Sequence, residues 1–254
     1  MTASSNVLAI FQAQRAGVEE LLNFDRFVLD HVVGGLGEIA DRLEARGRHN
    51  EATDVRNRLA VIRNIRSADS LRPRYETIFN QCVVLLVSYF GSTMGDLFRA
   101  AVTSALSLGL DVPVIDQSVQ VTWRRLGRVD VQVPELIAEA LVEQQKISFQ
   151  DMQSTGRAFR ENLGFDLPRD EATNDIILGQ AARHVIVHAA GTVDDRMINQ
   201  LRSAVPRRLK RDLVRGAAVQ FDPDEVRQLA TSMTDYLNDV ASRVDGLTRA
   251  RPAQ

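Results

Sequence analysis

The sequence contains a single cysteine, Cys82, among 254 residues. An intrachain disulfide is therefore excluded, and we expect the protein to fold in a reducing compartment, which points to the cytoplasm. Cys82 begins the apolar segment 82–87, where burial would raise the pKa of its thiol. The residue is therefore predicted to be an inert part of the core rather than a nucleophile.

Aromatic residues are few, at 6% of the chain, and neither sign of charge is in clear excess, since the formal net charge is −2. This balance excludes a generally basic coat for nucleic acid, so any nucleic-acid site has to be a local patch. Residues 1–5 lack the basic start and long apolar run of a signal peptide.

Long hydrophobic runs are also missing. Residues 77–95 carry no charge, but five polar side chains interrupt them, and the uninterrupted apolar stretch is only 82–87. A helix needs about 20 mostly apolar residues to cross a bilayer. We therefore predict a helix buried within the protein and no membrane partner. The interrupting residues are Asn80, Gln81, Ser88, Ser92 and Thr93.

Most of the chain shows apolar residues at spacings of three and four, which predicts an all-α fold. Glycines at 34, 35 and 37 are expected to break or bend the first helix. Thr192 with Asp195 resembles a capping box and predicts a helix start. Residues 110–133 fit a strand or a short helix, and 215–221 a short extended segment. Helices are predicted at 7–43, 51–65, 70–108 (ending before Gly109), 135–146, 149–163, 171–190 and 222–246.

Chemistry-bearing residues gather in the predicted helix 171–190. Arg183, His184 and His188 lie there among alanine, valine and isoleucine. The two histidines are four residues apart and share a helix face. Arg183 and His188 are separated by about 140° around the axis. Burying these groups is costly without a purpose or a partner.

Three interpretations of this segment remain open on its residues alone. The histidines could lie at a helix edge, satisfied by carbonyls or water. They could bind zinc, but no glutamate follows His184 in the HExxH manner and no third ligand is near in sequence. They could act on RNA, because imidazoles near neutral pKa transfer protons and an arginine stabilises a phosphorane.

Arg183, four residues and then His188 resemble the Arg-x4-His motif of HEPN ribonucleases. The longer segment 183–194 is similar to the bacterial RiboL-PSP-HEPN-like subfamily, whose pattern is Arg-His-x-x-x-His-Asn-x-Gly. Segments 83–90, 148–152 and 216–221 also resemble that family, so the likeness covers most of residues 70–248.

This resemblance implies a HEPN-like helical bundle at 70–248, preceded by a helical region at 1–69 that packs on it and followed by a frayed tail at 249–254. It implies a homodimer in which two motif helices face each other and form one composite site. Alanines at 181, 182, 189 and 190 would let those helices approach closely. The dimer axis is expected near Val185–His188.

The implied activity is a metal-independent endoribonuclease without a cofactor, acting by 2′-OH attack in a toxin–antitoxin system or in phage defence, with an antitoxin as a further partner. In this scheme Arg183 would stabilise the scissile phosphate, His188 would act as acid or base, and His184 would orient or assist. Two departures, Gly91 where the family often has an acid and Ala189 where it often has asparagine, could weaken catalysis.

A basic cluster follows the motif and would bind the RNA backbone. The alternative interpretation of this cluster is a solvated surface without a ligand. The cluster also lacks aromatic residues on which bases could stack. Two further functions stay open for the whole chain, namely a non-catalytic RNA- or nucleotide-binding module and a helical adaptor. The predicted RNA-binding residues are Arg196, Arg202, Arg207, Arg208, Lys210 and Arg211.

Overall fold

A computed structural model describes residues 3–67, 72–126 and 132–249. Within these ranges the protein is all-α, with no strand, as its periodicity predicted. The elements are α1 (Ala3–Ala45), α2 (His49–Ser67), α3 (Arg72–Leu108), the 3-10 helix η2 (Pro113–Asp116), α4 (Trp123–Leu126), α5 (Val133–Gln144), α6 (Met152–Leu163), α7 (Glu171–His188), α8 (Asp195–Leu201) and α9 (Pro223–Arg249).

Helix α3 forms the centre of the bundle and contacts α1, α5, α6, α7 and α9. Its apolar face is fully buried at Val83, Leu86, Phe90 and Leu97. Cys82 is buried too, as predicted, and burial raises the pKa of its thiol to about 11. Among the described residues, one segment, Thr77–Leu108 of α3, could cross a bilayer by length and composition alone. Its place within the bundle is that of a core helix.

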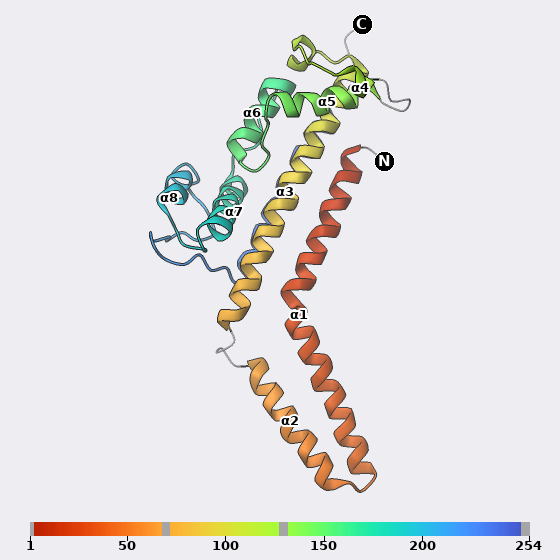
Figure 1. Cartoon of the computed structure of the whole chain (residues 1–254), viewed down its shortest axis with the longest axis vertical. Coiled ribbons are helices and arrows are strands. Elements are labelled where there is room, and N and C mark those ends of the chain that lie inside the picture. The colour runs from red at the N-terminus through yellow and green to blue at the C-terminus, as the bar shows by residue number, and fades with distance from the viewer. Residues whose placement is uncertain (1–2, 68–71, 127–131, 250–254) are drawn as a thin grey trace.

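Helices α1 and α2 form an antiparallel hairpin that extends beyond the rest of the bundle (Figure 1). The first half of α1 packs in the core through Phe11, Val18 and Leu22. Of the predicted break or bend at Gly34, Gly35 and Gly37, the break is wrong, since α1 runs unbroken through all three. Glycine lowers helix stability by about 1 kcal/mol relative to alanine, which is too little to end a helix supported by tertiary contacts.

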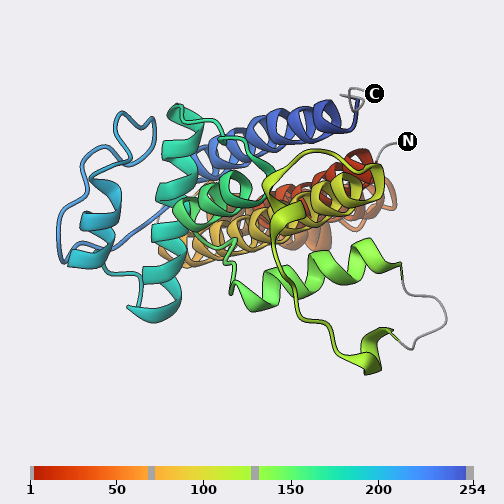
Figure 2. The same ribbon diagram turned by 90° about the horizontal axis from the view of Figure 1, so that it is seen from above.

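The connection between α3 and α5 lies on one side of the bundle, as Figure 2 shows from above. Gly109 follows α3 with φ +60°, the left-handed conformation expected at a helix end. For residues 110–133 the sequence left a strand or a short helix open, and the described part contains the short helices η2 and α4. Residues 127–131 lie outside the described residues.

Side-chain caps set the later helices. Asp222 accepts from the Glu225 amide while Glu225 accepts from the Asp222 amide, so the predicted start of α9 is confirmed. The predicted start at Thr192 is wrong, because Asp194 caps α8 by accepting from the Met197 amide. Thr192 instead forms an isolated antiparallel bridge with Ala218, the only extended pairing found for 215–221 among the described residues.

Candidate functional site

Helix α7 carries the candidate site, and its ends are well defined. Asp170 and Thr173 form a capping box at its start. In its middle, Gly179 lies so close to α9 that an added Cβ would meet Leu229 at 3.0 Å. At its end, Ala190 and Gly191 adopt positive φ values of 49° and 71°, which turn the chain away. These constraints fix the last turns of α7 against α3 and α9.

The last turns of α7 bring the two histidines together. The ring centroids of His184 and His188 are 5.0 Å apart, and the rings are tilted by 47°. His184 is half-buried, whereas His188 is exposed. The i, i+4 spacing therefore places one shielded and one solvent-accessible imidazole side by side, as helix geometry predicts.

The surroundings of His184 favour its neutral form. Desolvation is the main reason that its pKa lies below the ordinary value of 6.5. The positive charges of Arg196, His188 and Arg183 lower the pKa further, while the carboxylate of Asp194 opposes them. A neutral imidazole at pH 7 has one nitrogen free to accept a proton.

Arg183, beside this pair, has no compensating carboxylate among the residues that the structure describes. Its Nε is shielded from solvent and has no hydrogen-bond partner among the described residues, and no ion pair to Arg183 occurs there. A guanidinium with an unpaired buried Nε–H is a favourable place for an anion, because binding supplies both the opposite charge and the missing hydrogen bond. Gln180, one turn earlier, also has an unpaired buried amide nitrogen, while its oxygen accepts from the Met152 amide.

Of the four alanines predicted to let a second motif helix approach, two are not accessible to it. Ala181 and Ala182 are buried in the core of the chain itself, as is Val185. Near the motif, the part of α7 most open to solvent is its last turn, with Val187 49% exposed and His188 exposed. A second copy that approaches the motif would therefore meet this helix at its C-terminal end.

The predicted RNA-binding residues divide into two groups. Arg207 donates to the carbonyls of Lys210 and Arg211, and Lys210 pairs with Glu225 at 2.6 Å and lies over Phe221. These side chains hold the 205–211 segment in place. By contrast, three arginines are exposed and form no ion pair among the described residues, and these remain available to a phosphate backbone: Arg196, Arg202 and Arg211.

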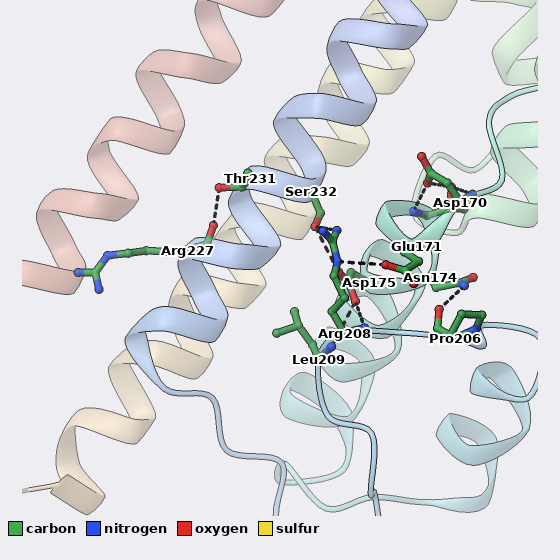
Figure 3. A network of polar contacts seen from close by, with 11 residues as sticks. Asp170, Glu171, Asn174, Asp175, Pro206, Arg208, Leu209, Arg227, Thr231 and Ser232 are labelled. Atoms are coloured by element: carbon green, nitrogen blue, oxygen red, sulfur yellow. Dashed lines mark hydrogen bonds and ion pairs between the residues drawn. The ribbon is translucent and has the colours of Figure 1, made fainter.

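Arg208 belongs to the structural group, through a buried network that the sequence did not reveal (Figure 3). The carboxylate of Asp175 is fully buried and accepts from the Arg208 amide and Nε, the Leu209 amide and the Ser232 hydroxyl. Arg208 also donates to Ser232. The network ties α7, α9 and the 205–211 segment together two turns before Arg183.

An open groove of about 460 Å³ lies between α3 and residues 147–150. Gly91 lines this groove, at the position where the pattern that the sequence resembles often has an acidic residue. A Cβ at Gly91 would meet Gln150 Nε2 at 2.8 Å and the Phe149 carbonyl at 3.0 Å, so an acidic residue could not stand there without moving this segment. Gly95 admits the Phe149 ring in the same way.

The lowered pKa of His184 predicts a pH dependence of stability. Below about pH 6.5 the unfolded chain binds a proton at this residue more readily than the folded chain, so stability falls as the pH decreases. His184→Gln should therefore reduce the fall in Tm that occurs when the pH is lowered from about 7.5 to about 5. Differential scanning calorimetry tests this, with the exposed His49→Gln as control. An unchanged pH dependence in His184→Gln would contradict it.

Within the described ranges, no group of three or more His, Cys, Asp or Glu side chains could hold a metal ion. No protein-family model, no curated protein and no solved structure matches this chain. The argument for function therefore rests on the chemistry of the α7 end.

Proposed function

We propose that the protein is a metal-independent endoribonuclease of the HEPN type, acting in the cytoplasm. One observation carries the proposal: an unpaired, partly shielded Arg183 stands beside a pair of imidazoles on one helix end. An arginine for phosphate charge and two histidines for proton transfer are sufficient for RNA cleavage by 2′-OH attack. The HEPN-like spacing of the same residues supports this assignment.

Each residue has a role that its surroundings support. Arg183 binds a non-bridging oxygen of the scissile phosphate and stabilises the charge that develops on it. His188, which is exposed, reaches the RNA and moves a proton to or from a reacting oxygen. His184 lies 5.0 Å from His188 (ring centroids) and orients it or assists the second proton transfer. The 2′-oxygen attacks phosphorus and the 5′-oxygen leaves with a proton, which gives a 2′,3′-cyclic phosphate and a 5′-hydroxyl.

A homodimer completes this proposed site. One Arg183 and one His188 point about 140° apart around the helix, so a single copy contacts one side of a phosphate. Two α7 ends related by a two-fold axis bring both sets into one cleft. Because Ala181 and Ala182 are buried, this contact involves the last turn around Val187 and His188. The free arginines at 196, 202 and 211 then bind the flanking RNA backbone.

Cleavage of RNA in EDTA tests the proposal. Wild-type protein should cleave a labelled structured RNA under these conditions, and Arg183→Ala should lower the rate by about 10²–10³-fold, the effect of removing one donor to a developing oxyanion. Arg243→Ala on α9 serves as a matched control that removes an exposed arginine paired with Asp239.

Other outcomes point to other functions. RNA binding without cleavage of any substrate would replace the enzyme by a non-catalytic RNA- or nucleotide-binding module. If the protein neither binds nor cleaves RNA, and Arg183→Ala behaves like the wild type in every cellular assay, a helical adaptor would be favoured. A role in a toxin–antitoxin system requires in addition that expression of the wild type, but not of Arg183→Ala, stops growth unless a cognate antitoxin is present. A role in phage defence requires that the wild type, but not Arg183→Ala, stops growth in infected cells only.

A further inference from the structure

An apolar stripe runs along one face of α1 and is partly open to solvent. Its side chains are between 37% and 61% exposed. They lie about 100° around the helix from the residues that face the core, such as Phe11, Val18 and Leu22, by helix geometry. The fold of one chain therefore leaves them partly exposed, outside its main core. The α1 stripe consists of Ile10, Leu21, Phe24, Val28, Val32 and Ile39.

Four of the six stripe residues form two pairs about the point between residues 24 and 25. If a second α1 runs antiparallel about that point, each residue faces the one whose number completes 49, so Ile10 faces Ile39 and Leu21 faces Val28. Phe24 then lies next to the axis. An isologous contact requires such self-complementarity, because the same surface has to serve both sides.

Two glycines fall within the same face and fit this pairing. In this register Gly17 faces Val32 of the second copy, and Gly35 faces its Gln14. A Cβ at either glycine would meet nothing within 4 Å, so the packing of one chain gives no reason for them. Glycine in a helix is less stable than alanine, but it allows a neighbouring helix to approach closely.

We propose that the α1 stripe is a homodimer interface in which two copies of α1 pair antiparallel around residues 24–25. This arrangement places each projecting α1–α2 hairpin alongside the half of the partner's α1 that packs on its core (Figure 1). Polar residues fit it too, since Glu20 and His31 lie on one flank of the stripe, and the antiparallel register brings the acid of each copy within two positions of the other's imidazole.

This interface is separate from the proposed catalytic dimer. Helix α3 lies between α1 and α7, so the α1 stripe and the α7 end face different sides of the molecule (Figure 1). The proposal does not rest on ribonuclease activity, and its test measures association alone. Because both contacts are isologous, a protein that forms both builds a larger assembly than a dimer.

Cysteine cross-linking tests the register. Near the axis, Phe24→Cys should form a disulfide-linked dimer with itself. Ile10→Cys and Ile39→Cys should cross-link only when the two variants are mixed, because two copies of residue 39 would lie about 44 Å apart along the helices. The native Cys82 is buried and, with its thiol pKa raised to about 11, does not compete.

Sedimentation measures the contribution of the stripe. Leu21→Glu with Val28→Glu should weaken the α1 association by about 100-fold or more, since charges would be buried at the centre of the contact. Trp123→Glu, which changes a side chain 88% exposed on α4, should leave it unchanged. Self-linking of Ile10→Cys and Ile39→Cys would overturn the antiparallel register. The interface would be overturned if the protein is monomeric and Phe24→Cys forms no cross-linked dimer. It would also be overturned if a monomer binds lipid vesicles through this face instead.

Discussion

Replacing Asp175 by alanine is expected to destabilise the folded protein by about 2–4 kcal/mol, because buried amide donors lose their acceptor and the partly exposed Arg208 loses its main partner. The carboxylate of Asp175 is 0% exposed and accepts from two amides, a guanidinium and a hydroxyl. Without it, the amides of Arg208 and Leu209 lose their acceptor and the Arg208 side chain loses its buried counter-charge. Urea unfolding followed by circular dichroism measures the change.

The matched control for this prediction is an exposed ion pair. Asp166 pairs with Arg160 at 2.5 Å, but both side chains are more than half exposed. Asp166→Ala should therefore cost less than about 1 kcal/mol. A loss of the same small size in Asp175→Ala would mean that the network of Figure 3 does not hold the 205–211 segment to α7 and α9.

Replacing His188 by alanine is expected to lower RNA cleavage by about 10²–10⁴-fold, the contribution typical of a general acid or base. His188 is the exposed member of the pair and so the one that a bound RNA can reach. Its removal leaves Arg183 and the free arginines in place, so RNA affinity should change little. Single-turnover cleavage in EDTA and a separate filter-binding assay distinguish the two effects.

His31→Ala provides the control, since His31 is an exposed histidine on α1 whose ring contacts Phe27 at a tilt of 43°, remote from α7 in sequence and on another helix. It should leave cleavage at the wild-type rate. If His188→Ala retains full activity while binding is unchanged, the proton transfers belong to other groups and the roles proposed for the α7 end are wrong.

The local features of the fold could be predicted because they depend on neighbours in sequence. The 3.6-residue periodicity of apolar side chains specified the helices, and the pairing of Asp222 with Glu225 marked the start of α9. The adjacency of His184 and His188 followed from their i, i+4 spacing alone. Burial of Cys82 followed from the apolar segment around it.

Contacts between residues far apart in the chain decided the rest. The sequence could not show that Arg208 is committed to Asp175, 33 positions away, whereas Arg196 is free, because both are arginines in one basic segment. The glycines of α1 resisted prediction for the same reason. Their intrinsic preference opposes a helix, but the contacts of α1 with α2, α3 and α9 outweigh it.

The sequence by itself determined an all-α protein with an arginine and two histidines on one helix. Only the tertiary structure decided that this helix end is open, that Ala181 and Ala182 face the core, and that Arg183 lacks a counter-charge among the described residues. The reason is physical: helix spacing fixes which side chains share a face, whereas exposure and charge pairing depend on which other elements pack against that face.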